Sequence, residues 1–180
     1  MKKLTLKGMI LAAAFAALTG ILTQVQIPLE PVPINLALFS VYLAGALLGP
    51  KYGLISMLVY VLLGAVGVPV FSGFSGGLHK LVGPTGGYIA GYILCAFVVG
   101  LLSRKWNFHF TMLSVAMLIG LAACYALGTV WFMIVTGRDL ATSLGLCVIP
   151  FLPGDAVKII LAALLAGRLR APLQASVWTE

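Results

Sequence analysis

Long apolar segments, separated by single charges or short polar turns, make up most of the chain. Because a helix needs about 20 apolar residues to cross a bilayer, each of these segments is a candidate membrane span. Uncharged runs occupy 8–29, 31–50, 52–79, 81–103, 106–137 and 140–154, and a nearly apolar stretch follows at 156–169. The pattern predicts six membrane-spanning helices, near 6–25, 34–49, 52–69, 85–103, 111–136 and 153–169.

Glycine and proline residues interrupt this pattern at two places. Gly49-Pro50 separates the second predicted helix from the third, because proline lacks an N–H and its ring disfavours helix continuation. Residues 67–84 hold too many Gly, Ser and Pro residues for a continuous helix. We expect this segment to be a long loop that folds over the bundle as a lid. The fold class is therefore an all-α, six-helix membrane bundle, with residues 1–180 forming a single integral membrane domain.

The composition agrees with a membrane location. The chain is 62% hydrophobic and only 8% charged, whereas a soluble domain carries about 25% charged residues. Three lysines precede the apolar run 8–29 and imitate a secretory signal peptide. That run is long enough to span a bilayer, so we expect it to be retained as the first transmembrane helix.

The distribution of charge predicts how the chain is oriented in the cell membrane. Six spans place both termini on one side. If that side is cytoplasmic, it carries eight basic residues and one acid, while the outer side carries three of each sign. This asymmetry follows the positive-inside rule and predicts cytoplasmic termini with 67–84 outside. It also explains the net charge of +7 without nucleic acid. The cytoplasmic set is Lys2, Lys3, Lys7, Lys51, Arg104, Lys105, Arg168, Arg170 and Glu180.

The chain carries no recognisable catalytic or metal-binding pattern. Cys95, Cys124 and Cys147 lie in apolar segments without the spacing of a metal or redox site. A phosphate-binding loop, a His-Glu-x-x-His motif and a Gly-x-Ser-x-Gly motif are all missing from the sequence. The chain is therefore predicted to be neither an enzyme nor the holder of a cofactor or metal.

Asp155 and Lys158 are the leading candidates for substrate binding. They lie at the start of the last predicted helix, at the edge of the bilayer. A charge costs about 2.5–3.5 kcal/mol at the centre of a membrane helix, so a chain that keeps such a pair is expected to use it. Three residues apart, they share one helix face. Asp155 suits N–H donors of a solute, and Lys158 suits a carbonyl or carboxylate oxygen. The alternative is a mutual ion pair with no ligand.

A second candidate element is the start of the fourth predicted helix, at Thr85, Gly86, Gly87 and Tyr88. The first N–H groups of a helix have no internal partner and carry partial positive charge, so they suit a carboxylate or carbonyl. Glycine lets a ligand approach the backbone closely. The alternative is helix packing through small residues spaced four apart.

Small residues also form a stripe along the first predicted helix, at Ala12, Ala13, Ala16 and Ala17. Alanines at this spacing permit close contact with another helix. That helix belongs either to a partner protein or to this chain.

Three stretches together resemble the BioY family, the biotin-specific substrate-binding (S) components of energy-coupling-factor (ECF) vitamin transporters. The first joins Pro31-Val-Pro-Ile-Asn35 with Leu43–Pro50, the second runs from Gly67-Val-Pro-Val-Phe71 to Gly83-Pro-Thr-Gly-Gly-Tyr88, and the third is Pro150–Lys158. The resemblance covers about Pro31 to Gly167.

This resemblance implies a six-helix bundle that binds biotin from outside and works with a transmembrane coupling subunit and two ATP-binding-cassette ATPases. By the same resemblance, Asp155 and Lys158 contact the ligand, and the alanine stripe docks on the coupling subunit. The chain has Pro33-Ile-Asn-Leu-Ala37 where the family pattern has Pro-Ile-Thr-Leu-Gln, so Asn35 is the candidate substitute contact. The alternative functions are an S component or solitary carrier for another small vitamin, and a ligand-free membrane scaffold.

Overall fold

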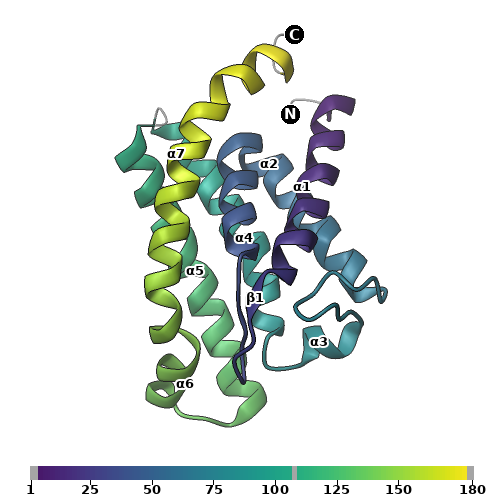
Figure 1. The fold of residues 1–180 in the computed structure, drawn as a ribbon, viewed down its shortest axis with the longest axis vertical. Coiled ribbons are helices and arrows are strands. Elements are labelled where there is room, and N and C mark those ends of the chain that lie inside the picture. Colours follow the sequence, from purple (N-terminus) through teal and green to yellow (C-terminus); the bar gives the residue numbers. More distant parts are fainter. Residues whose placement is uncertain (1–3, 107–108, 178–180) are drawn as a thin grey trace.

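The structure is a computed structural model that describes residues 4–106 and 109–177. Long helices form one bundle, and the N-terminal end of α1 lies at the same end of the bundle as the C-terminal end of α7 (Figure 1). Lys2, Lys3 and Glu180, which enter the predicted charge asymmetry, lie outside the described residues. The elements are α1 (Leu6–Gln24), β1 (Gln26–Ile27), β2 (Ile34–Asn35), α2 (Ala37–Ala65), α3 (Leu78–Val82), α4 (Gly86–Lys105), α5 (Phe110–Thr136), α6 (Leu140–Cys147), the 3₁₀ turn η1 (Ile149–Phe151) and α7 (Leu152–Val177).

Five helical segments of the described chain are long and apolar enough to cross a membrane. They are α1, α2, α4, α5 and the combined segment Leu140–Arg170. Their lipid-facing surfaces expose many large apolar side chains, such as Leu118 and Ile134. Such surfaces are favourable only in an apolar solvent. The prediction of a helical, multi-pass membrane protein is confirmed at this level.

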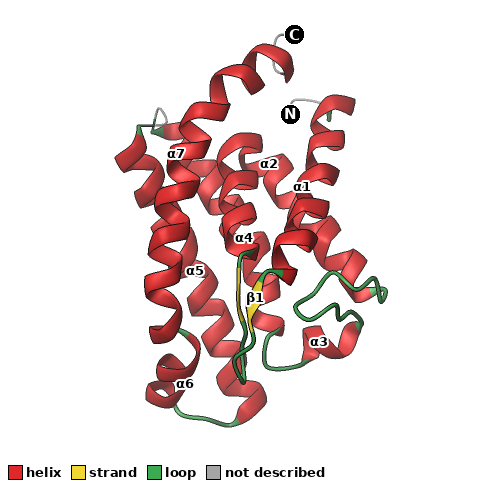
Figure 2. Ribbon diagram, in the orientation of Figure 1, coloured by secondary structure: helices red, strands yellow, loops and turns green. Residues whose placement is uncertain are grey.

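Two short strands precede α2 and change its expected start (Figure 2). β1 pairs antiparallel with β2, with Gln26 opposite Asn35 and Ile27 opposite Ile34. The sequence prediction that a helix begins at residue 34 is therefore wrong by three residues. The pairing with β1 explains the difference, because it holds Ile34 and Asn35 extended, and the Asn35 side chain then accepts from the Ala37 N–H at the start of the helix.

The predicted break at Gly49 turns α2 into a helical hairpin. Gly49 has φ +78°, a left-handed conformation that glycine adopts without steric cost. Hydrogen bonds to α1 show that the two halves run in opposite directions. Ser40 bonds Thr19 and Tyr60 bonds Thr23 near the C-terminal end of α1. The tyrosine between them in sequence, Tyr52, instead bonds Thr5 at the other end of α1.

The segment between α2 and α4 is a loop that contains the single-turn helix α3, in agreement with the prediction that it is not a continuous helix. Its anchor is Phe71, which is 2% exposed and packs edge-on against Tyr60 at 5.6 Å between ring centroids. Gln24 of α1 holds the backbone on both sides, by donating to the Phe71 carbonyl (3.2 Å) and accepting from the Phe74 N–H (2.8 Å). The loop is thus fixed to the ends of α1 and α2.

The region before α7 is more helical than expected. No helix was predicted over Leu140–Cys147, yet α6 forms there and continues through η1 into α7. Asp139 caps α6 by accepting hydrogen bonds from the Thr142 side chain (2.6 Å) and backbone N–H (3.1 Å). These bonds hold the pKa of Asp139 below its ordinary value. The helix predicted at 153–169 begins at Leu152 and extends to Val177.

Glycines set the close spacing between the helices at the centre of the bundle. A Cβ at Gly100 of α4 would lie only 2.5 Å from the backbone of Gly49 and Pro50. At Gly45 it would lie 2.6 Å from the Ala96 carbonyl oxygen. Small residues at such contacts let backbones approach and gain dispersion energy, which is the main force between helices in lipid.

We expect Gly100→Ala to destabilise the protein by about 1–3 kcal/mol, because the new methyl group must push α4 away from the α2 turn. Gly167→Ala is the matched control, since a Cβ there meets no atom within 4 Å and alanine favours a helix. Thermal unfolding in detergent measures both. Equal melting temperatures for the two variants would contradict this account of the packing.

Candidate functional site

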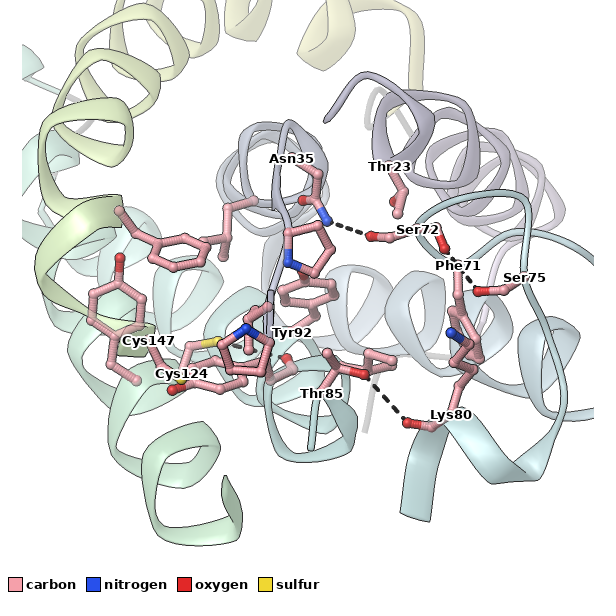
Figure 3. A pocket seen from close by; sticks show the side chains of 18 of the residues that line it. Thr23, Asn35, Phe71, Ser72, Ser75, Lys80, Thr85, Tyr92, Cys124 and Cys147 are labelled. Carbon is pink, nitrogen blue, oxygen red and sulfur yellow. Dashed lines mark hydrogen bonds between the residues drawn. The ribbon is translucent and has the colours of Figure 1, made fainter. Parts of the chain in front are cut away.

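A cavity of about 150 Å³ lies near the C-terminal end of α1 and the N-terminal end of α7, at the end of the bundle opposite the start of α1. Aromatic rings and short polar side chains from almost every element surround it (Figure 3). The lining residues are Thr23, Pro31, Val32, Pro33, Asn35, Leu38, Tyr60, Phe71, Ser72, Ser75, Lys80, Thr85, Tyr88, Ile89, Tyr92, Cys124, Tyr125, Cys147, Phe151 and Lys158.

Aromatic side chains form much of the cavity wall. Tyr60 comes from α2, Tyr88 and Tyr92 from α4, and Tyr125 from α5. Phe71 adds a ring from the loop. Rings of this kind present broad apolar faces to a ligand, and tyrosine hydroxyls add polar contacts at the edges. The cavity therefore suits a compact apolar ring system with a few polar groups.

Asp155 and Lys158 form a buried ion pair beside this cavity. The Lys158 Nζ lies 2.7 Å from the Asp155 Oδ1, and the two residues are 6% and 0% exposed. The Tyr125 hydroxyl donates to the other oxygen, Asp155 Oδ2. Lys158 and Tyr125 line the cavity, and Asp155 lies behind them. The predicted pair is therefore brought together, with Lys158 nearest to a ligand.

This arrangement satisfies the electrostatic requirements of a charge pair out of water. An isolated buried charge costs several kcal/mol, and the cost is offset only when each charge has a close partner and further hydrogen bonds. Asp155 has two such partners, one from its own helix and one from α5. Asp155 and Lys158 therefore pair with each other, and Lys158 also lies at the cavity wall.

Asn35 lines the cavity from strand β2 and not from a helix, which corrects the sequence interpretation of its element. Its side chain joins two segments. Asn35 Nδ2 donates to the Ser72 hydroxyl (2.8 Å), and Asn35 Oδ1 accepts from the Ala37 N–H (3.0 Å) at the start of α2. Asn35 therefore links the loop after α2 to the strand before it.

The predicted element at the start of α4 is divided between cavity and packing. Thr85 and Tyr88 line the cavity, and the Tyr88 hydroxyl bonds the Thr129 hydroxyl at 3.1 Å. Gly86 and Gly87 are not among the lining residues. A Cβ at Gly86 would overlap the Leu81 carbonyl at 1.7 Å, and one at Gly87 would lie 2.3 Å from Trp131. These contacts favour the helix-packing interpretation for the two glycines.

The alanine stripe of α1 is divided in the same way. Ala12 and Ala16 are 1% and 2% exposed and pack inside this chain. Ala13 and Ala17 are exposed. The prediction that all four alanines face a partner is therefore corrected for Ala12 and Ala16, because the α2 hairpin covers them. Ala13 and Ala17 remain available on the outer face.

Several lining residues were not singled out from the sequence. Thr23, Tyr60 and Ser72 come from three different segments and meet only through the hairpin and the anchored loop. A polar residue inside an apolar run is a signal for Thr23 and Tyr60. No sequence signal separates Ser72 from Ser75, since both lie in one Ser-Gly-rich loop.

A model described as the BioY family matches residues 1–175 of the chain. The chain belongs to the BioY family. Among its relatives, the probable biotin transporter BioY of Pyrococcus horikoshii is 42% identical over 91% of this chain and 96% of its own length. The biotin transporter BioY of Thermotoga maritima is also 42% identical, over 92% of this chain and 96% of its own length.

A solved structure agrees with the BioY assignment. The S-component for biotin from an ECF-type ABC transporter superimposes with a TM-score of 0.86 and 31% identity, covering 94% of this chain and 95% of that one. The resemblance seen in the sequence is thus confirmed, and so is the S-component fold. The BioY relatives are transporters and not enzymes.

Proposed function

We propose that this BioY-family protein binds biotin in the aromatic cavity and delivers it for uptake as the S component of an ECF transporter. The observation that carries the proposal is Lys158 at the cavity wall, paired with buried Asp155 and backed by Tyr125. The biotin transporters among the relatives and the solved biotin S-component support the choice of ligand.

The chemistry of biotin fits the groups around the cavity. Its ureido ring offers two N–H donors and a carbonyl, its bicyclic body is apolar, and its tail ends in a carboxylate. Lys158 at the cavity wall suits the carbonyl or the carboxylate. The Tyr125 oxygen, whose proton goes to the buried Asp155, can accept from an N–H donor. Tyr88, Tyr92 and Tyr125 offer faces to the bicycle. Phe71, Ser72 and Ser75 bring the 67–84 loop to the cavity, so this loop is proposed to act as the lid.

We further infer that the chain crosses the cell membrane six times with both termini in the cytoplasm. The reversal of direction at Gly49 supports two crossings by α2. The described basic residues Lys7, Lys51, Arg104 and Lys105 are at or near the ends of α1, α4 and the α2 hairpin turn, where the positive-inside rule expects cytoplasm. The cavity then opens toward the outer side.

The proposed partners are the transmembrane coupling subunit and the two ATP-binding-cassette ATPases of an ECF transporter. Ala13 and Ala17 offer an exposed, smooth face on α1 for contact with the coupling subunit. This face lies on the side of α1 away from the α2 hairpin, so a partner can approach without disturbing the cavity.

The ligand site is tested by Asp155→Asn, which we expect to weaken biotin binding by about tenfold to over a hundredfold, the effect of losing a charge-assisted hydrogen bond. Lys158→Ala is expected to have a similar effect, because the ligand oxygen and Asp155 both lose a partner. Isothermal titration calorimetry of the purified protein measures the affinity. Asp139→Asn is the matched control, since Asp139 lies in an exposed cap away from the cavity.

The double variant Asp155→Asn/Lys158→Ala separates this proposal from a ligand-free scaffold. A purely structural pair predicts that removing both charges restores stability and leaves no ligand effect to measure. A binding pair predicts a folded double variant that binds biotin no better than the worse single variant. Unchanged biotin affinity in Asp155→Asn would remove this site from the function, and stabilisation by another vitamin instead of biotin would favour a different substrate.

The orientation predicts that a cysteine at position 79 reacts with a membrane-impermeant thiol reagent in intact cells. His79 is exposed on the loop, so His79→Cys tests the outer side. Lys105→Cys at the end of α4 is the control for the inner side and is expected to react only after lysis. The three native cysteines are at most 1% exposed, which keeps background labelling low. The opposite labelling pattern would reverse the topology.

The docking face predicts that Ala13→Trp abolishes co-purification of the coupling subunit while biotin affinity stays within about twofold, because a large ring separates closely packed helices. Ala122→Trp, on an exposed face of α5, is the matched control and is expected to assemble normally. Ala16→Trp is expected to harm folding, since Ala16 is buried within the chain. Normal assembly of Ala13→Trp would assign docking to another surface.

A further inference from the structure

A second lysine, Lys80, lines the cavity on the side away from the Asp155–Lys158 pair. It belongs to α3, which packs against α2 and α4, whereas α7 packs against α2 and α5. In Figure 3 the Lys80 side chain is at the opposite side of the cavity from the yellow-green ribbon of α7. Lys80 is half-buried, so its ammonium group is only partly screened by water.

The two lysines differ in their electrostatic surroundings. Lys158 is neutralised by Asp155 at 2.7 Å. Among residues 4–106 and 109–177, the structure records no ion pair for Lys80. The other described acids do not line the cavity, since Asp139 caps α6 and Glu30 lines a second pocket together with Arg138. The lining of the cavity therefore carries an uncompensated positive charge, and it lies at Lys80.

Hydroxyl groups accompany this charge. Ser72, Ser75 and Thr85 line the cavity, and Figure 3 shows them on the same side as Lys80. The Ser72 oxygen accepts from Asn35 Nδ2 at 2.8 Å, which leaves its own proton to donate. The Ser75 and Thr85 hydroxyls donate to the backbone carbonyls of Ser72 (2.8 Å) and Lys80 (3.5 Å) and so fix the loop around the lysine. An ammonium group beside the Ser72 hydroxyl donor is a suitable receptor for a carboxylate.

We propose, building on the proposed function, that Lys80 binds the carboxylate of biotin and makes the site select the free acid over neutral derivatives. Biotin is elongated, with its ureido group and its carboxylate at opposite ends. The ureido end lies at Lys158 and Tyr125, which the buried Asp155 holds in place and which offer a donor and an acceptor. The tail crosses the cavity to Lys80 and the Ser72 hydroxyl. Lys80 is thus a specificity residue carried by the lid loop, and the ligand's charge holds that loop closed.

The test compares biotin with biotinamide, in which a neutral amide replaces the carboxylate, by calorimetry on the purified full-length protein. The wild-type protein is expected to prefer biotin by about tenfold. Lys80→Met keeps the length of the side chain and removes its charge, so this preference should disappear while affinity for biotinamide stays unchanged. Lys80→Arg keeps the charge and should retain most of the preference. His79→Gln, on the neighbouring exposed loop residue, is the matched control.

The outcomes distinguish this inference from the proposed function. If Lys80→Met still prefers biotin by the wild-type factor, or if the wild-type protein binds both ligands equally, Lys80 does not read the carboxylate. An equal loss of affinity for both ligands in Lys80→Met would assign the residue to loop structure and would also overturn the inference. Failure of the wild-type protein to bind either ligand would overturn the biotin function itself, and with it the role of Lys80.

Discussion

The buried contact between Asp155 and Lys158 is the constraint on which the rest of the structure depends. Burying a charged pair in an apolar bundle is costly unless each group has a close partner of opposite sign and further hydrogen bonds. Asp155 obtains both, from Lys158 one helical turn away and from the Tyr125 hydroxyl on α5. The Tyr125 hydrogen bond ties the start of α7 to α5. It thereby fixes where the polar end of the cavity lies.

Close helix packing positions the other walls around this polar end. Glycines at the α2 turn and on α4 bring backbones together, so that α4 lies against both halves of the hairpin and against α5. The hairpin returns Tyr60 to the level of Ser40, beside the C-terminal end of α1. Phe71 then packs on Tyr60 and anchors the loop over the cavity. The loop between α2 and α4 is therefore held by contacts that depend on the hairpin.

The distribution of charge around the cavity relates the site to its ligand. One lysine is neutralised by a carboxylate of the protein, and the other has no recorded ionic partner in the described chain. A neutral, hydrogen-bonding end and a cationic end suit a molecule that has a neutral ureido ring and an anionic tail. Electrostatic complementarity of this kind contributes to selectivity as well as to affinity.

Much of the fold and part of the site follow from local sequence. Apolar runs long enough to span lipid, and charges that are costly there, are properties of the residues themselves. The membrane class and the break at Gly49-Pro50 could therefore be predicted, and Asp155 and Lys158 could be singled out as candidates. Their spacing of three residues also predicted a shared helix face. The family motifs around Pro31, Gly83 and Pro150 supplied the link to biotin.

Other features depend on which helices meet, and local pattern carries no such information. Ala12 and Ala13 are adjacent and identical, yet only Ala12 is covered by the α2 hairpin. The sequence pattern of Gly86 and Gly87 is compatible with ligand binding and with helix packing. In the structure Leu81 packs against Gly86, and Trp131 packs against Gly87. Tyr125 becomes a partner of Asp155, and Lys80 comes to line the cavity, only through the packing of distant segments. The sequence thus determined that the chain is a helical membrane protein and which charged residues it carries. The tertiary structure decided which helix faces enclose the cavity, because that depends on contacts between distant segments.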